Sequence, residues 1–167
     1  MTPHSHRLVA LLAALLAGLA LASAFASEWY GELVPCALCL VQRWPYRIII
    51  ALGLIAAFAN RRWGMALIGL AALVFFADAV VAFIHVGVEQ KFWPSPLPEC
   101  MAPNLGGGSI ADRLARMPLL PSKPCEDPTF LIPGLPISMA AMNMIYALIT
   151  GSGFACWTWR KWRGRTA

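Results

Sequence analysis

Cys36 and Cys39 form a Cys-X-X-Cys motif between two long apolar stretches of the chain. Two thiols at this spacing can form a disulfide, bind a metal ion or exchange electrons with another thiol pair. A disulfide between them would close so short a loop that it would restrain the unfolded chain very little. Adjacent thiols near the start of a helix, in contrast, exchange readily. The motif therefore favours redox chemistry over a purely structural role.

Arg43 follows Cys39 by about one helical turn. If a helix begins near Cys39, the two side chains lie on the same helical face. A guanidinium group in this place can stabilise a Cys39 thiolate or an anionic acceptor. An arginine at a membrane interface can also simply extend its charged end to the lipid headgroups. Both roles stay open, and Arg47, one turn further on, can share either of them.

The composition of the chain is that of a membrane protein. Of its 167 residues, 59% are hydrophobic and 13% are charged, and its mean hydropathy is +0.66. Residues 1–167 are expected to form one integral membrane domain, because so short a chain has no room for a separate soluble domain. The net charge of +5 does not indicate nucleic-acid binding, since the basic residues lie at the ends of apolar stretches. A transporter is disfavoured because only Asp78 and Asn143 stand out as polar residues inside these stretches.

Four apolar stretches approach or reach the length that a transmembrane helix needs. They predict an all-α, four-transmembrane-helix bundle with a long loop between the third and fourth helices, at about residues 86–135. Ten of the 13 prolines fall between Pro94 and Pro136, so no regular core is expected in that loop. The first stretch also resembles a cleavable signal peptide, which leaves open whether it is retained. The expected spans are about residues 8–26, 40–59, 63–84 and 137–159.

The basic residues indicate how the bundle is oriented in the membrane. One set of basic residues flanks the apolar stretches in segments that contain no acidic residue. By the positive-inside rule these segments, with both termini, are cytoplasmic. The two larger connections then lie on the opposite side of the membrane, together with four of the five cysteines. Cys156 falls near the cytoplasmic end of the last span, where inert packing is expected. The basic set is Arg7, Arg61, Arg62, Arg160, Lys161, Arg163 and Arg165, and the four cysteines are Cys36, Cys39, Cys100 and Cys125.

An even set of four cysteines outside the cytoplasm suggests two disulfides, because thiols there persist mainly in that form. The Cys-X-X-Cys spacing favours a Cys36–Cys39 pair, which leaves Cys100 with Cys125. Both pairs can also be purely structural. A zinc site made of all four sulfurs is disfavoured by the long gap inside the second pair, and no metal is expected. The segment 93–98, rich in proline, is expected to be extended and to present Cys100 away from the bundle.

Several motifs together resemble the disulfide bond formation protein B (DsbB) family. The resemblance covers nearly the whole chain and is specific, because a Cys-X-X-Cys motif with an arginine four residues later stands at a membrane boundary, with a second cysteine pair before the last span. The segments that carry it are Cys36-Ala-Leu-Cys39-Leu-Val-Gln-Arg43, His85-Val-Gly-Val-Glu89, Trp93-Pro-Ser-Pro96 leading to Cys100, and Cys125.

The resemblance implies an inner-membrane thiol:quinone oxidoreductase of bacteria, which reoxidises a DsbA-like oxidase, a periplasmic dithiol protein with the thioredoxin fold. The partner's thiolate would attack the Cys100–Cys125 disulfide, most readily at Cys100, and the released thiolate would attack the Cys36–Cys39 disulfide. Ubiquinone or menaquinone would then accept the electrons from Cys39. Arg43 would polarise the quinone carbonyl, and His85 would lie near the same ring.

Two other functions are compatible with the sequence. A dedicated DsbB paralogue would serve one specific oxidase and client, and a structural membrane subunit would use the disulfides only to staple its loops. The role of Asp78 is open: it can pair with Arg43 or Arg47, or it can relay protons.

The expected topology can be tested with reporter fusions. Fusions at Asn60 and at the C-terminus should report a cytoplasmic location, and a fusion at Gly107 should report a periplasmic one, because the acid-free basic segments all lie on one side. A cytoplasmic reading at Gly107 would place the four cysteines on the wrong side and remove the basis for the exchange mechanism.

Overall fold

Four helices in the computed structural model are long and apolar enough to cross a membrane, as the sequence predicts. The structure describes residues 4–100, 109–111, 123–132 and 134–164, and within them it is all-helical apart from one isolated bridge. The four spans are Ser5–Trp29, Ala37–Phe58, Arg61–Glu89 and Met139–Arg163. The helices are α1 (His4–Trp29), α2 (Ala37–Val41), α3 (Arg43–Phe58), α4 (Arg61–Glu89), the 3₁₀ helix η1 (Pro98–Cys100) and α6 (Met139–Arg163).

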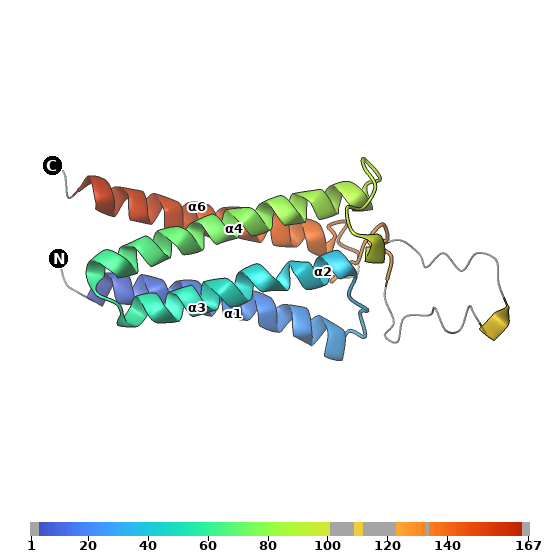
Figure 1. Ribbon diagram of the computed structural model, residues 1–167, viewed down its shortest axis with the longest axis horizontal. Helices are drawn as coiled ribbons and strands as arrows, with labels where there is room; N and C mark the ends of the chain where they lie inside the picture. The colour runs from blue at the N-terminus through green and yellow to red at the C-terminus, as the bar shows by residue number, and fades with distance from the viewer. Residues whose placement is uncertain (1–3, 101–108, 112–122, 133, 165–167) are drawn as a thin grey trace.

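The long helices run side by side along one axis, and both chain termini lie at the same end of the bundle (Figure 1). At the other end lie α2, η1 and the segment that precedes α6. Helix α1 packs mainly against α3, and α4 packs mainly against α6 and α3. This arrangement brings the two segments that carry the paired cysteines to one end of the molecule. Part of the expected long loop, residues 101–108, 112–122 and 133, lies outside the described residues.

Each span extends beyond its prediction at one end at least, although α3 ends at Phe58 and α6 begins at Met139, just inside the predicted bounds of 59 and 137. Helix α4, for example, continues to Glu89, whereas the predicted span stops at residue 84. Apolar composition marks only the part of a helix that lies in the hydrocarbon, while the backbone hydrogen bonds continue through the interfacial region. Two of the starts are capped by polar side chains: Asn60 accepts a hydrogen bond from the backbone N–H of Trp63, and Ser138 accepts one from Ala141.

Helix α1 turns its small residues to the interior of the bundle and its large ones outward. On α1, Ala10, Ala13 and Ala17 are fully buried, whereas Leu8 and Leu15 are exposed on the outer surface. Gly53 of α3 lies so close to the α1 backbone at Ala10 that a Cβ atom there would collide with it. Such close approach is how helices associate in lipid, where burying leucine gains nothing over leaving it in contact with acyl chains.

A polar cluster joins three helices in the middle of the bundle. Asp78 of α4 is fully buried and accepts a hydrogen bond of 3.0 Å from the side-chain amide of Asn143 on α6. The Tyr46 hydroxyl of α3 donates to the carbonyl oxygen of the same amide. Of the two roles left open for Asp78, the pairing with Arg43 or Arg47 is wrong, because the hydrogen-bond donor that reaches its carboxylate comes from α6. An acid inside a span faces protein here, as its cost in lipid requires.

Removing the Asn143 side chain should destabilise the bundle. Asn143→Ala deprives Asp78 and Tyr46 of their shared partner, so we expect a loss of about 1–2 kcal/mol. Thermal unfolding in detergent measures it, with Ser152→Ala, an exposed position on the same helix, as the matched control. If the two variants unfold at the same temperature, the cluster does not stabilise the fold.

Candidate redox centre

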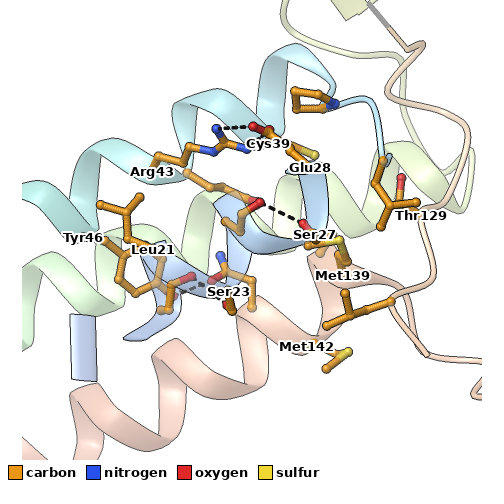
Figure 2. Close-up of a pocket in the computed structure, with 18 of the residues that line it drawn as sticks. Leu21, Ser23, Ser27, Glu28, Cys39, Arg43, Tyr46, Thr129, Met139 and Met142 are labelled. Atoms are coloured by element: carbon orange, nitrogen blue, oxygen red, sulfur yellow. Dashed lines mark hydrogen bonds and ion pairs between the residues drawn. The ribbon is translucent and has the colours of Figure 1, made fainter. Parts of the chain in front are cut away.

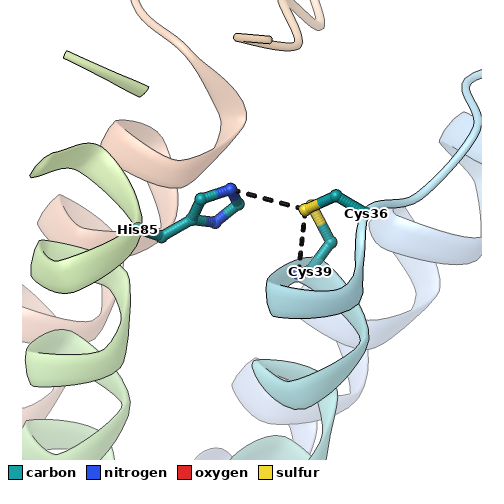
Figure 3. Close-up of side chains that lie close together, drawn as sticks. All are labelled: Cys36, Cys39 and His85. Carbon is teal, nitrogen blue, oxygen red and sulfur yellow. Dashed lines mark hydrogen bonds between the residues drawn. The ribbon is translucent and has the colours of Figure 1, made fainter. Parts of the chain in front are cut away.

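The Cys-X-X-Cys motif begins helix α2, with Cys36 at the N-cap position. The backbone N–H of Cys39 donates to Cys36 Sγ, at 3.2 Å, and the Cys36 thiol donates to Cys39 Sγ, at 2.8 Å (Figure 3). Both residues are free thiols in this structure; Cys36 is buried and Cys39 is half-buried. The hydrogen bond to Cys39, together with burial, raises the pKa of Cys36. In the dithiol state Cys36 therefore keeps its proton and shares it with the Cys39 sulfur.

His85 of α4 faces the buried member of this pair. Its Nε2 atom lies 3.4 Å from Cys36 Sγ (Figure 3). One helical turn further on, a carboxylate oxygen of Glu89 lies 3.9 Å from the same nitrogen, and the other Glu89 oxygen accepts a hydrogen bond from the Ser138 hydroxyl. A line of polar groups thus runs from the start of α2, across α4, to the start of α6. All of these side chains except the Cys39 thiol are buried.

The second cysteine pair is a disulfide between Cys100 and Cys125, and it is packed against the first pair. Cys100 is 2% exposed and Cys125 is fully buried, in a cluster with Cys36 and Val88. The backbones also meet, since Lys123 forms an isolated bridge with Cys36. The expectation that Cys100 is presented away from the bundle is therefore wrong.

Trp93 explains why the chain turns back after α4. Its indole N–H donates to the carbonyl oxygen of Ile84, at 3.1 Å, and its ring packs against Phe83. Gly87 makes room for the ring, because a Cβ atom at this position would occupy the space of the indole. The segment after Trp93 consequently starts next to α4 rather than extending into solvent. The prolines of segment 93–98 indicated a stiff chain, but they did not indicate that the chain runs back along α4.

A cavity of about 430 Å³ lies next to the Cys-X-X-Cys motif, between α1, the start of α3 and the start of α6 (Figure 2). Cys39 and Arg43 both line it, which agrees with their predicted place on one helical face. Most of the rest of its wall is apolar, and includes Leu16, Leu21, Val34, Leu131, Met139 and Met142. Such an enclosure, apolar with a few polar groups gathered at one place, is typical of a small-molecule site.

The polar end of the cavity is formed by Arg43, Gln42 and Glu28. The Arg43 guanidinium makes an ion pair with both carboxylate oxygens of Glu28, at the end of α1 (Figure 2). It also lies over the ring of Phe25, 4.9 Å from the ring centre. Arg43 Nε and Gln42 Nε2 are buried, and neither has a hydrogen-bond partner among the described residues. Both side chains line the cavity, and N–H donors at one end of an apolar cavity suit a ligand that carries a carbonyl oxygen.

The structure thus divides the predicted site residues into two groups. Cys39 and Arg43 lie at the cavity, whereas Cys36, His85 and the Cys100–Cys125 disulfide lie together on the side of α4. His85 is not among the residues that line the cavity, although the resemblance placed it near the quinone.

Two residues considered in the sequence analysis lie away from the site, and three residues of the site were not predicted. Arg47 lies over Trp44, and Cys156, expected to pack inertly, is an exposed thiol on α6. Sequence reasoning missed the roles of Glu28, Gln42 and Glu89. The one signal available for Glu28 was an acid at the end of a span, close before the cysteine motif.

A comparison with protein-family models identifies the family of the chain. The family model for disulfide bond formation protein DsbB matches residues 6–157, which include Cys36, Cys39, Cys100 and Cys125. Neither the curated proteins nor the solved structures contain a significant match. Because the family match covers most of the chain and the helices form the expected membrane bundle, this multi-pass membrane protein belongs to the DsbB family of disulfide bond formation proteins.

Proposed function

We propose that the protein is a thiol:quinone oxidoreductase of the bacterial inner membrane. It reoxidises a periplasmic, thioredoxin-fold dithiol oxidase of the DsbA type and passes the electrons to ubiquinone or menaquinone. The observation that carries this proposal is the position of Cys39 and Arg43 on the wall of one apolar cavity. A redox-capable sulfur, a cation and an apolar enclosure are the three elements that a thiol-to-quinone transfer needs.

The first step is an exchange at the Cys100–Cys125 disulfide. A thiolate of the partner attacks Cys100, a mixed disulfide forms, and the bond to Cys125 breaks. The Cys125 thiolate then attacks Cys36 of an oxidised Cys36–Cys39 pair, which releases Cys39 as the leaving thiolate. The second thiol of the partner attacks the mixed disulfide and releases Cys100, and the Cys100 thiolate attacks the Cys125–Cys36 bond. This re-forms the Cys100–Cys125 disulfide and leaves Cys36 and Cys39 as a dithiol. The packing of Cys36, Cys100 and Cys125 in one cluster supports this order of transfer. Because Cys100 is almost fully buried, docking of the partner must uncover it.

His85 is suited to handle the proton of Cys36. Its Nε2 atom is 3.4 Å from Cys36 Sγ, within range for proton exchange with the thiol. Glu89, one turn further along α4, places a carboxyl group next to the imidazole, and Ser138 fixes the orientation of that group. We therefore assign His85 to the thiol side of the centre, and not to the ring of the quinone.

The second step takes place at the cavity. A bound quinone supplies a two-electron, two-proton acceptor, and the Cys36–Cys39 disulfide forms again as the pair loses two electrons and two protons. Cys39 presents its sulfur to the cavity. Arg43 and Gln42 line the cavity beside Cys39, so a carbonyl oxygen of the ligand would meet their side chains. Glu28 balances the charge of Arg43 through the ion pair, which keeps a buried cation tolerable before the ligand enters.

A structural subunit with stapled loops is the second candidate, and the burial of the Cys100–Cys125 disulfide favours it. Trapping experiments separate the two functions. Cys125→Ser should leave Cys100 free to form a stable mixed disulfide with a partner oxidase that lacks its resolving cysteine. Non-reducing electrophoresis detects the adduct, and Cys156→Ser, which removes an exposed thiol elsewhere, serves as the control. An adduct formed only at Cys36 or Cys39 would mean that the loop disulfide is a staple.

Substitution of Arg43 tests the quinone reaction. Arg43→Ala removes the cation beside Cys39 and the acceptor carbonyl, so quinone reduction by the reduced partner should fall on the order of 10²-fold. Arg43→Lys should retain part of the activity, because the charge survives but the planar donor group does not. The KM for quinone should rise more than the KM for the partner protein.

The matched control is Arg47→Ala, which removes an exposed arginine one turn further along α3. It should leave both KM values near those of the parent. Oxidation of the partner without any consumption of quinone would refute the proposed function itself. Equal effects of Arg43→Ala and Arg47→Ala would remove Arg43 from the quinone site.

A further inference from the structure

Three potential metal ligands converge beside the cavity. Cys36 Sγ, Cys39 Sγ and a ring nitrogen of His85 all lie within 4.8 Å of one another (Figure 3). The two sulfurs come from the start of α2, and the imidazole comes from α4, 49 residues further along the chain. This set differs from the four-cysteine zinc site that the sequence disfavours, because a histidine takes the place of the second cysteine pair. Cys36 and His85 are buried, so the packing of the fold fixes the positions of these two ligands.

We propose that Cys36, Cys39 and His85 bind a thiophilic divalent cation such as Zn²⁺ when the cysteine pair is in its dithiol state. On binding, both thiols lose their protons, and two S–Zn bonds and one N–Zn bond form without any transfer of electrons. Two thiolates neutralise the cation, and the imidazole is neutral, so the site carries no net charge where it is buried. Three protein ligands leave a fourth position open for water or for an adjacent carboxylate.

The geometry fits with one small adjustment. Tetrahedral zinc with ordinary bond lengths places a sulfur and a nitrogen ligand about 3.5 Å apart, and Cys36 Sγ and His85 Nε2 are 3.4 Å apart. Two sulfur ligands would be about 3.8 Å apart, whereas the two sulfurs here are 2.8 Å apart. Cys39 must therefore move its thiol away from Cys36 Sγ while bringing it to about 3.5 Å from the His85 nitrogen, from which it lies within 4.8 Å. Its side chain is only half-buried. Glu89, whose carboxylate lies 3.9 Å from His85 Nε2, adds negative charge next to the cation.

Metal binding would hold the enzyme in its reduced form. While both sulfurs are bound to the cation, neither can attack a disulfide or pass electrons to an acceptor. An oxidised pair offers no thiolate, so the site exists only after the pair is reduced. The proposal needs only that Cys36 and Cys39 can be thiols, and it is therefore independent of the identity of the electron acceptor.

Equilibrium binding of Zn²⁺ to the full-length chain in detergent tests this site. The protein carries Cys100→Ser, Cys125→Ser and Cys156→Ser, so that the Cys-X-X-Cys pair supplies the remaining thiols. It is reduced with a phosphine and freed of reductant before competition with a chromogenic chelator. We expect one Zn²⁺ per chain in the reduced form and none in the oxidised form of the same polypeptide. Cd²⁺ should give a thiolate charge-transfer band in the reduced form alone.

His85→Ala should weaken Zn²⁺ binding on the order of 10²-fold or more, since even the loss of a group that only orients a ligand costs 10- to 100-fold. His6→Ala, which removes a buried histidine of α1, is the matched control and should bind as the parent does. If the serine background does not fold, the same pair of histidine variants is compared in the reduced wild-type chain, where only His85→Ala should lose one bound Zn²⁺.

Equal Zn²⁺ binding by reduced and oxidised protein would overturn the proposal, as would equal affinities of the two histidine variants. Failure of quinone reduction with intact Zn²⁺ binding would count against the proposed function alone. Normal quinone reduction without Zn²⁺ binding would count against the metal site alone.

Discussion

The N-cap of α2 is the constraint on which the redox centre depends. Because Cys36 caps the helix and bonds to the N–H of Cys39, the two sulfurs stay together while their surroundings differ. Cys36 is buried against α4, where His85 and the Cys100–Cys125 disulfide lie. Cys39, one turn before Arg43, lines the apolar cavity on the side of α1 and α6. The start of α2 thus has one cysteine on the side of the second disulfide and the other on the side of the apolar cavity.

The bundle supports this division by packing its helices unequally. Helix α1 packs mainly on α3, and α6 packs on α4. The C-terminal half of α1 and the start of α6 therefore leave room for the cavity between them. The hydroxyl of Tyr146 on α6 bonds to the Leu16 carbonyl of α1, at 2.9 Å, and this contact joins the two helices at the wall of the cavity. One turn closer to the start of α6, Asn143 belongs to the cluster with Asp78 and Tyr46 that ties α3, α4 and α6 together. Two members of this cluster, Tyr46 and Asn143, also line the cavity.

The sequence predicted what lipid and local geometry impose. A bilayer requires about 20 apolar residues in each helix, so the number and order of the spans followed from hydropathy. The shared face of Cys39 and Arg43 followed from the helical repeat. Contacts between distant segments were out of reach, because nothing local encodes them: Glu28 reaches Arg43 only through the packing of α1 on α3. Likewise, His85 meets Cys36 and not the cavity because of where α4 lies, and Cys100 is buried because Trp93 folds back onto α4.

In the proposed reaction, the unequal burial of the cysteines also gives the electron path a direction. Cys36 is the member of its pair that packs with Cys100 and Cys125, so reducing equivalents from the loop disulfide meet it first. Its raised pKa, caused by the hydrogen bond to Cys39 and by burial, keeps it protonated in the dithiol state, and its thiol proton points at Cys39. Cys39 is then the sulfur that faces the cavity together with Arg43. An exchange in the opposite order would require Cys36 to face the acceptor, but Cys39 and not Cys36 lines the cavity.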